Sequence, residues 1–365
     1  MKAPVATRER LAPEVFELPL EKIRTGYYSD AYFNFTKQLL DGQDRHPQVT
    51  MQVFQKHQSL LGGIDEAIAV LKQCSGRQDG ERWRPGWDEL EVSALYEGDP
   101  VSPYESVLMI EGDYSLFAHL ETVYLGCMAR RSLVMRNVRE VVDAAAGKPI
   151  LFFPARHDHW LVQTGDGWAA HVAGAIGVST DAQASWWGGR GVGTVPHALI
   201  AAFGGDTVEA ARSFAERFSD ELNVTVLVDF DNDSIRTALA VADGLGDRLW
   251  GVRLDTSERL VDRGLWQHMG EFPPTGVTVQ LVERVRAALD AAGHERVKIV
   301  VSGGFDAEKI RVFEAAGAPV DSYGVGSSLL RGQNDFTADV VRLDGRPCAK
   351  VGRTYKPNSR LERVN

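Results

Sequence analysis

Short apolar runs, each bounded by polar residues or glycine, recur through the second part of the chain. They are PILFF (149–153), VTVLVDF (224–230), LWGVRLD (249–255), KIVVSGG (298–304) and SYGVGS (322–327). Such runs are typical of parallel strands that are buried on both faces of a sheet. Between them, apolar residues recur at helical spacing in residues 207–218, 234–248, 278–293 and 306–317. This pattern predicts repeated strand–helix units over residues 116–334, arranged as a closed barrel or an open doubly wound sheet.

Residues at the ends of these helices support the assignment. Asp306 precedes one helix, and an aspartate there can accept a hydrogen bond from a free backbone N–H group. Gly293 and Gly317 follow two others, where a helix commonly ends on a residue in the left-handed conformation. We therefore expect Asp306 to be an N-cap and both glycines to end helices.

The first 115 residues have a different pattern. VTMQVFQ (49–55) alternates apolar and polar residues as a strand does, and residues 59–74 place Ile64, Ile68 and Leu71 on one helical face. Residues 88–114 mix short strands with Gly and Pro turns. We expect an N-terminal α+β domain over residues 1–115 with mostly antiparallel strands. Residues 335–365 contain short strands and a polar tail, and are expected to complete this first domain.

Composition narrows the class of protein. The chain has 365 residues, a hydrophobic fraction of 44% and a formal net charge of −10. An acidic chain disfavours nucleic acid as a partner, because phosphate contacts need clustered Lys and Arg. The cysteines, Cys74, Cys127 and Cys348, form no CxxC pair, so we expect neither a disulfide framework nor a zinc knuckle. We find neither a signal peptide nor a run of about 20 apolar residues, and expect a cytoplasmic protein without membrane contact.

Chemically informative residues follow the predicted strands. In both parallel architectures, ligands bind at the carboxyl ends of the strands. Five neighbouring ends carry polar groups or glycine; these are Arg156-His157-Asp158-His159, Asp229 with Asp231, Arg253 with Asp255, Ser302-Gly303-Gly304, and Gly324-Val325-Gly326-Ser327-Ser328. One charged strand end means little, but five in succession indicate a ligand site.

The two glycine segments predict a phosphate site. Ser302-Gly303-Gly304 and Gly324-Val325-Gly326-Ser327 each precede a predicted helix. Backbone N–H groups at a helix N-terminus favour an anion, and glycine lets the anion approach closely. Each segment alone is also compatible with a glycine turn that serves only chain geometry. Their occurrence on consecutive strands favours phosphate binding.

The charged residues leave alternatives open. Asp229, Asp231 and Asp255 are suited to Mg²⁺ coordination or to stabilising a developing positive charge, but equally to helix capping. Arg156 and Arg253 are suited to clamping an anion or to internal ion pairs with these aspartates. His197, in GVGTVPHALI (191–200), is by itself more typical of a structural histidine.

With these residues in place, the chain resembles the nicotinate phosphoribosyltransferase family, including its nicotinamide-using relatives. SDAY (29–32) is similar to the family's TDxY, LET (120–122) to its Glu-Thr element and FPAR (153–156) to its FGxR. GVSTDA (177–182) followed by GTVPHALI (193–200) is similar to its GTxxxH region. LVDFD, VRLD, SGGFD and GVGSSLL then follow in family order. Each fragment is short, whereas the ordered set covers most of the chain.

The resemblance implies a type II phosphoribosyltransferase fold, an α/β class in which an irregular, incomplete α/β barrel accompanies an N-terminal α+β domain. It implies transfer of phosphoribosyl from phosphoribosyl pyrophosphate to nicotinate, giving nicotinate mononucleotide and pyrophosphate in NAD salvage. It also implies Mg²⁺ as cofactor and ATP as co-substrate, with ATP hydrolysis coupled through a phosphohistidine in the manner of a ligase. The partner it implies is a second copy of the chain, in a homodimer with the site at the interface or in a higher oligomer.

The resemblance also assigns roles to individual residues. Phe153 stacks on one face of the pyridine ring, and Tyr32 from the neighbouring subunit covers the other. Arg156 and Arg253 hold anionic groups of the ligand, and Asp255 meets the ribose hydroxyls directly or through Mg²⁺. The ribose 5′-phosphate is bound by the glycine segments, that is by Ser302, Gly303, Gly304, Gly324, Gly326 and Ser327. His197 matches the phosphorylated histidine, and Asp229 the carboxylate that orients it.

Three departures bear on the choice of base. FPAR has Pro154 where the family has glycine, and His157-Asp158-His159 stands where nicotinate enzymes carry a second arginine. Asp181 falls near the aspartate with which nicotinamide-using relatives accept the amide N–H, and a carboxylate there would repel the acid. The PHALI form of the histidine motif resembles the nicotinate-using branch instead.

Three alternatives to a nicotinate-using enzyme remain. The first is nicotinamide, or another pyridine base, on the same fold. Quinolinate is less favoured, because the chain is long for that enzyme and shows no arginine-rich run for a dicarboxylate. A catalytically silent barrel that binds a nucleotide is the third; the intact set of Asp229, Arg253, Asp255, Ser302 and Gly326 argues against it.

Overall fold

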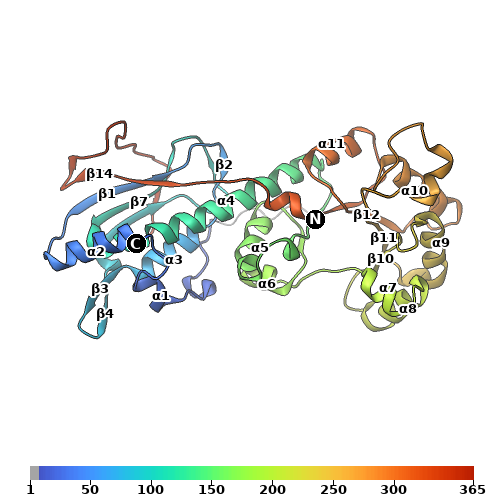
Figure 1. The fold of residues 1–365 in the computed structure, drawn as a ribbon, viewed down its shortest axis with the longest axis horizontal. Helices are drawn as coiled ribbons and strands as arrows, with labels where there is room; N and C mark the ends of the chain where they lie inside the picture. The colour runs from blue at the N-terminus through green and yellow to red at the C-terminus, as the bar shows by residue number, and fades with distance from the viewer. Residues whose placement is uncertain (1–7) are drawn as a thin grey trace. The chain divides into compact units, whose positions relative to one another are not determined.

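The computed structural model describes residues 8–365 (Figure 1). Its contacts divide the chain into two compact units, and the first runs up to Arg136 and also includes Gly332–Asn365. The second unit is Asn137–Arg331. The division falls inside helix α4 (Glu121–Ala144), whereas the sequence pattern places it near residues 115 and 335. A continuous helix shows no change of pattern at the residue where its packing partners change.

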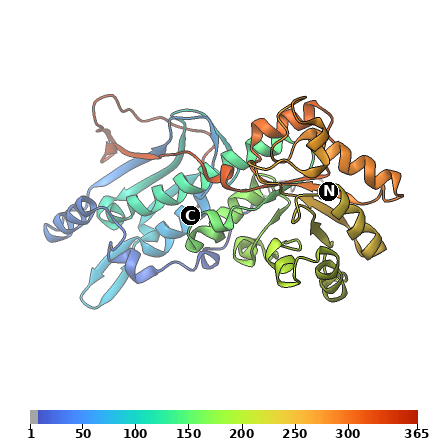
Figure 2. The same cartoon turned by 45° about the vertical axis from the view of Figure 1, so that its right-hand side comes forward.

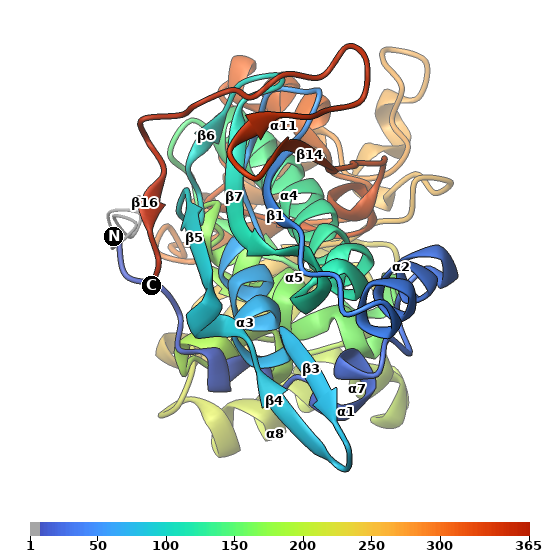
Figure 3. The ribbon, with the colours of Figure 1, turned by 90° about the vertical axis from the view of Figure 1, so that its left-hand side faces the viewer.

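The first unit contains an antiparallel sheet of six strands in the order β15-β14-β1-β7-β5-β16 (Figure 3). Its strands are β1 (Gln48–Phe54), β5 (Leu90–Ala94), β7 (Ser106–Asp113), β14 (Thr337–Leu343), β15 (Arg346–Pro347) and β16 (Glu362–Arg363). The C-terminal residues supply β14, which pairs with β1 with Met51 opposite Val340. The smaller strand pairs are β2 (Ser59–Leu60) with β6 (Pro100–Val101) and β3 (Gly76–Asp79) with β4 (Arg82–Pro85).

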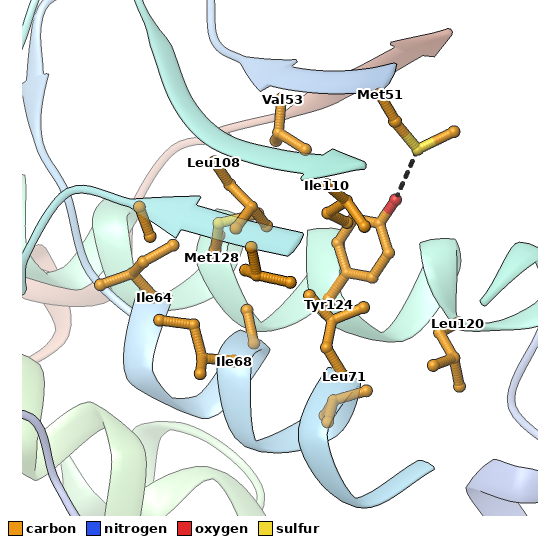
Figure 4. Close-up of a cluster of buried hydrophobic side chains, with 14 of the residues drawn as sticks. Met51, Val53, Ile64, Ile68, Leu71, Leu108, Ile110, Leu120, Tyr124 and Met128 are labelled. Carbon is orange, nitrogen blue, oxygen red and sulfur yellow. Dashed lines mark hydrogen bonds between the residues drawn. The ribbon is translucent and has the colours of Figure 1, made fainter. Parts of the chain in front are cut away.

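Helices α3 and α4 contribute to the core of this unit. The predicted helix forms as α3 (Ile64–Cys74), and the face carrying Ile64, Ile68 and Leu71 is buried as expected. Apolar side chains of β1 and β7 meet it, together with Tyr124 and Met128 from α4 (Figure 4). The Tyr124 hydroxyl lies 3.2 Å from the Met51 sulfur, so the one polar group of that ring has a partner inside the core. The remaining helices of the unit are α1 (Leu20–Arg24) and α2 (Ala31–Gly42).

The second unit contains a parallel sheet with the strand order β10-β11-β12-β13-β8-β9. The strands are β8 (Ile150–Phe152), β9 (Gly177–Val178), β10 (Thr225–Leu227), β11 (Gly251–Leu254), β12 (Lys298–Val301) and β13 (Ser322–Val325). Its helices are α5 (Gln163–Val172), α6 (Asp181–Ala184), α7 (His197–Ala202), α8 (Thr207–Phe218), α9 (Ser234–Leu245), α10 (Val279–Ala291) and α11 (Ala307–Ala315). Helices α8, α9 and α10 lie outside strands β10–β12 (Figure 1 and Figure 2).

The predicted strand–helix units are confirmed. Every apolar run contains a strand, and the four helical stretches form α8 to α11. Asp306 caps α11 by accepting a hydrogen bond from the Lys309 N–H, and Gly293 and Gly317 have φ values of 82° and 68°. No strand pairing closes the sheet regularly between β9 and β10 in the described residues. The second unit is thus the incomplete, irregular barrel that the family resemblance implies, and the chain also contains a mixed α/β N-terminal unit.

Within residues 8–365, no helix has both the length and the apolar character that a bilayer crossing requires.

Candidate active site

The candidate site begins where parallel strands β11 and β12 end side by side. Leu254 pairs with Val301 at the last position of the ladder, so the next residues, Asp255 and Ser302, leave the sheet together. The Ser302 hydroxyl donates to Asp255 Oδ1 at 2.7 Å. The predicted convergence of polar groups at the strand ends therefore exists at these two strands.

Arg253 is the centre of this network. Its Nε donates to Ser302 Oγ at 2.7 Å, and Nη1 donates to Thr194 Oγ1 at 3.2 Å. Its Nη2 lies 3.7 Å from Asp255 Oδ1, and its Cζ lies 5.1 Å from the centre of the Phe153 ring. Burial lowers the pKa of the Arg253 guanidinium, while Asp255 raises it. A mostly buried cation beside an aromatic ring is suited to receiving an anionic, planar ligand.

The first glycine segment forms a turn beside Asp255. Gly303 and Gly304 have φ values of 82° and 66°, in the left-handed region that side chains disfavour. A Cβ on Gly304 would collide with the carboxylate of Glu258, and Lys309 Nζ donates to the Gly303 carbonyl at 3.3 Å. The turn therefore needs glycine for its left-handed conformation.

The second glycine segment lies next to the first. Gly324 in β13 packs against the Phe153 ring, and Gly326 and Ser327 lead into the short 3-10 helix η10 (Ser327–Leu330). The Ser328 hydroxyl donates to the Phe305 carbonyl at 2.8 Å, and so links the residues that directly follow the two glycine segments. The structure brings together the two turns from which the sequence predicts a phosphate site.

His197 and Asp229 form a second polar pair. His197 Nε2 lies 3.0 Å from Asp229 Oδ1, and the aspartate side chain is only 6% exposed whereas the histidine is 41% exposed. The hydrogen bond to Asp229 is the largest influence on His197 and raises its pKa, and the charge of Asp255 adds to the effect. His197 is thus oriented by a buried carboxylate while its ring remains accessible.

Other predicted residues lie outside this network. Arg156 is exposed in the 3-10 helix η5 (Ala155–His157), although its charge still lowers the pKa of Arg253. Asp181 begins α6, and its Oδ1 accepts the Gly191 N–H at 2.8 Å. Asp231 pairs with Arg236 at 2.7 Å on the surface. Tyr32 belongs to the first unit, on α2, with 60% of its surface exposed.

Two family-like fragments meet within the first unit. The Asp30 N–H donates to Thr122 Oγ1 at 3.0 Å, and the Thr122 hydroxyl donates to Asp30 Oδ2 at 2.9 Å. Ser29 also donates to the carbonyl of His119. SDAY is thereby fixed to LET at the start of α4, and Tyr32 follows directly on α2. The motifs hold the helix that carries Tyr32.

Sequence reasoning missed two residues of the site. Thr194 supplies an acceptor to Arg253, and Lys309 donates to the Gly303 carbonyl. Thr194 stands in the GTxxxH-like segment, but that motif pointed to His197. Lys309 has no sequence signal beyond its position after a glycine turn, whereas Ser328 lies in the predicted GVGSSLL strand end.

The candidate site offers few protein ligands for a divalent cation. No cluster of three or more His, Cys, Asp or Glu side chains in residues 8–365 is arranged to hold a metal ion. Asp229 is buried and already paired with His197, while the Asp255 side chain is 26% exposed. Since Mg²⁺ often binds through one carboxylate and the phosphates of a substrate, Asp255 fits such an ion better than Asp229 does.

Comparison with known proteins identifies the family to which this fold belongs. Residues 30–132 match the model of the quinolinate phosphoribosyl transferase N-terminal domain. Over 283 residues, 74% of this chain, the sequence is 31% identical to nicotinate phosphoribosyltransferase pncB1 of Mycobacterium tuberculosis. The structure of nicotinate-nucleotide pyrophosphorylase from Pyrococcus furiosus is 32% identical, with a TM-score of 0.78 over 95% of this chain and 85% of that one. This chain belongs to the nicotinate phosphoribosyltransferase family.

Two further comparisons define the extent of the similarity. The nicotinate phosphoribosyltransferase of Bacillus subtilis is 25% identical over 280 residues, which cover 74% of this chain. The matches span only 58% and 52% of the Mycobacterium tuberculosis and Bacillus subtilis relatives. Human nicotinic acid phosphoribosyltransferase shares the fold, with a TM-score of 0.66 at 18% identity over 90% of this chain and 77% of the human one. The nicotinate phosphoribosyltransferase family thus includes members much longer than the matched region.

Proposed function

We propose that this protein is a nicotinate phosphoribosyltransferase, which forms nicotinate mononucleotide and pyrophosphate for NAD salvage. The observation that supports this most is the network of Arg253, Ser302 and Asp255 beside two linked glycine segments. It combines a cation, a carboxylate and free backbone N–H groups at adjoining strand ends. A sugar phosphate with a charged leaving group requires this combination of charges.

In the proposed complex, the ribose 5′-phosphate binds at Ser302, Gly303, Gly304, Gly324, Gly326 and Ser327. Asp255 hydrogen-bonds the ribose hydroxyls, and Arg253 holds an anionic group of the ligand above Phe153. Departure of pyrophosphate leaves positive charge on the sugar, and the Asp255 carboxylate stabilises that charge. The pyridine nitrogen then forms the new bond to C1 of the ribose.

Mg²⁺ is part of the proposal as a cofactor. Asp255 would hold the ion, which would supply positive charge to neutralise the leaving pyrophosphate. Asp229 remains the hydrogen-bond partner of His197 in this scheme.

We also propose that ATP phosphorylates His197. With Nε2–H donating to Asp229, Nδ1 carries the lone pair. Nδ1 forms a bond to the γ-phosphorus of ATP while the bond to the ADP oxygen breaks, so ADP leaves and water later hydrolyses the phosphohistidine. Asp229 stabilises the positive charge that the ring gains in the attack. This pair supports coupling of ATP hydrolysis to the transfer reaction.

The proposed base is nicotinate, with nicotinamide as the alternative. Arg156, on the exposed helix η5, would attract the nicotinate carboxylate. The alternative rests on Asp181, because the oxygen that does not accept the Gly191 N–H could accept an amide N–H from nicotinamide. A carboxylate near the ring substituent favours the amide over the acid by charge.

The proposed assembly is a homodimer in which Tyr32 covers the base bound by the partner. Helix α2 has no buried residue, and Tyr32, Phe35 and Leu39 follow one another at helical spacing with exposed fractions of 60%, 65% and 59%. An apolar stripe of this kind is typical of an interface. Its position on the helix that carries Tyr32 supports a site shared between two copies.

A turnover assay tests the function. The purified chain is incubated with phosphoribosyl pyrophosphate, Mg²⁺ and nicotinate, nicotinamide or quinolinate, with and without ATP, and mononucleotide and pyrophosphate are measured. We expect nicotinate mononucleotide, in larger amount with ATP. If only nicotinamide or only quinolinate gives product, that base is the substrate in place of nicotinate. If none of the three bases gives product, the proposed activity is contradicted.

A further inference from the structure

The C-terminal chain crosses the sheet of the first unit. Strands β15 and β16 are the two edge strands of that sheet, so residues 348–361 pass from one edge to the other (Figure 3). Residues 352–358 of this crossing, called here the strap, contain no helix or strand. Because the strap pairs with no strand, side-chain contacts must hold it against the sheet.

Buried polar side chains of β1 and β7 supply these contacts. Gln52 is 2% exposed; its Nε2 donates to the Thr354 carbonyl at 3.0 Å, and its Oε1 accepts the Lys356 N–H at 3.0 Å. The Ser106 hydroxyl, equally buried, donates to the Lys356 carbonyl at 2.9 Å. Since a buried polar group is costly without its partner, these contacts fix the backbone of the strap. The side chains of the strap are thus presented at defined places.

The strap encloses a cavity of about 330 Å³ against the end of β1. Its lining contains two aromatic rings, Phe54 of β1 and Tyr104 of the loop before β7, and two cations, Arg353 and Lys356. The other lining residues are Gln52, Gly352 and Thr354. No carboxylate is among these lining residues, although the chain as a whole has a net charge of −10. The cavity is therefore locally positive and partly aromatic.

The two cations lie against the two rings. Arg353 Cζ is 5.2 Å from the centre of the Phe54 ring, and Lys356 Nζ is 5.1 Å from the centre of the Tyr104 ring. Arg353 Nε donates to Asp339 Oδ2 at 2.6 Å, a contact that uses one of the three guanidinium nitrogens. Lys356 forms no ion pair within residues 8–365. Both cations therefore keep N–H donors for an anion.

Tyr104 has an unfavourable backbone conformation. Its φ is 63°, in the left-handed region that bulky residues rarely adopt, and its N–H donates to the Gln55 carbonyl at 2.7 Å. A tyrosine here costs conformational free energy that glycine would not, and such strain is typical of residues that serve in binding. The Tyr104 ring is 44% exposed, with its centre 5.9 Å from that of Phe54. An exposed ring beside two cations favours a ligand that is planar and anionic.

We propose that this cavity binds a nucleoside monophosphate, with the base stacked on the exposed Tyr104 ring and the phosphate at Lys356 and Arg353. A planar ring and an anion in one molecule match both features of the lining. The volume is at the lower end of small-molecule sites, which suits one base and one phosphate rather than a dinucleotide. All the lining residues belong to the first unit, whereas the network around Arg253 belongs to the second. The inference therefore does not rest on the proposed function.

Calorimetry on the full chain tests the site with AMP and UMP as probes, because the lining selects a ring with a phosphate and no particular base. We expect at least one of the two to bind with a Kd below about 1 mM. Inorganic phosphate should bind about tenfold or more weakly, since it offers no ring to Tyr104. Saturating phosphoribosyl pyrophosphate with Mg²⁺ should not displace the nucleotide, because the cavity lies outside the proposed active site.

Two substitutions locate the bound nucleotide. Lys356→Met keeps the length of the side chain and removes its charge, and should weaken nucleotide binding about tenfold. Tyr104→Ala removes the stacking ring and should weaken nucleotide binding about tenfold, with no effect on inorganic phosphate. Tyr104→Phe keeps the ring and should bind as the unaltered chain does. Lys350→Met is the matched control, since Lys350 is an exposed lysine outside the lining, and should leave the affinity unchanged.

Several results would overturn the inference. They are no binding of either nucleotide, equal affinity for inorganic phosphate, displacement by phosphoribosyl pyrophosphate, and full affinity in Lys356→Met. A loss of affinity in Lys350→Met as large as in Lys356→Met would also overturn it, by showing attraction to surface charge in general. Melting temperatures identify a variant that fails to fold, and Lys356→Met, on the exposed strap, then decides the outcome. If the chain transfers no phosphoribosyl group, the proposed function fails, while nucleotide binding and its loss in Lys356→Met still test this site.

Discussion

Ser302 and Asp255, 47 positions apart in sequence, share a 2.7 Å hydrogen bond at the ends of neighbouring strands β12 and β11. The same serine oxygen accepts from Arg253 Nε at 2.7 Å. Ser302 is itself only 3% exposed, so its hydroxyl has no ready replacement by water. One hydroxyl thus orients both the carboxylate and the cation of the proposed phosphoribosyl site.

Replacing this hydroxyl should damage catalysis more than folding. We expect Ser302→Ala to lower kcat/KM for phosphoribosyl pyrophosphate about 10- to 100-fold, because hydrogen bonds to two charged groups are lost together. Steady-state kinetics measure the change. Ser322→Ala is the control, since Ser322 is a buried serine in β13 whose hydroxyl has no hydrogen-bond partner in the described residues. Equal effects of both substitutions would contradict the assigned role.

Removal of His197 should separate the ATP-dependent step from the transfer. We expect His197→Ala to abolish stimulation by ATP and leave a slow ATP-independent reaction, because the proposed phosphoryl acceptor is gone. The assay compares nicotinate mononucleotide formation with and without ATP. His294→Ala removes another histidine–aspartate pair, 2.8 Å from Asp243, and should leave stimulation intact. Persistent stimulation in His197→Ala would exclude this histidine from the mechanism.

Asp181→Asn should change the choice of base and keep the hydrogen bond that holds Gly191. Asparagine keeps an oxygen to accept the Gly191 N–H, and an amide nitrogen replaces the second carboxylate oxygen. If that oxygen contacts the ring substituent, the ratio of kcat/KM for nicotinate over nicotinamide rises by about tenfold, since charge repulsion of the acid is removed. The ratio measured with both bases checks this. An unchanged ratio would mean that Asp181 does not contact the base and serves only to bind the Gly191 N–H.

Glu121 makes the first unit sensitive to pH. Burial raises the pKa of its carboxyl to about 8, and Asp339 and Asp30 add to the effect. The folded chain therefore holds a proton that the unfolded chain releases near pH 4.5, so this group's stabilisation is complete below that pH and is lost as the pH rises toward 8.

Glu121→Gln should remove this contribution. We expect the variant to melt at a higher temperature than the unaltered chain at pH 8, and the difference to shrink toward pH 5. Thermal melts across this pH range measure it. Burial also raises the pKa of Glu97 to about 8. Because Glu97 is present in both proteins, its contribution to the pH dependence cancels in the comparison. A difference that does not vary with pH would contradict the assignment to Glu121.

Periodicity alone predicts most strands of the second unit and its last four helices, but not the long helix α4. The apolar runs coincide with β8 and β10 to β13, and the helical stretches with α8 to α11. A strand that is buried on both faces of a sheet is apolar at nearly every position, so it is visible in the sequence. Strand ends also mark Asp255 and Ser302, since parallel strands end at the same edge. This part of the candidate site follows from chain direction and needs no knowledge of contacts.

His197 shows where local pattern fails. Its own segment favours a structural histidine, and only the approach of Asp229 from the end of β10 gives it a buried carboxylate partner. The contacts of Thr194 and Lys309 could not be predicted for the same reason. Their contacts depend on side-chain directions between strands and loops that are distant in sequence.

The sequence by itself determined β1 and α3, most strands and the last four helices of the second unit, three residues at helix ends, and the strand ends at which polar residues gather. Those features depend on interactions within a few residues, or on a hydrophobic pattern that repeats along the chain. Tertiary structure alone decided that the barrel stays open between β9 and β10, that residues 191–197 join its edges, and that the two units divide inside α4. Each of these depends on which distant surfaces pack together, and packing between distant segments has no periodic signature in the sequence.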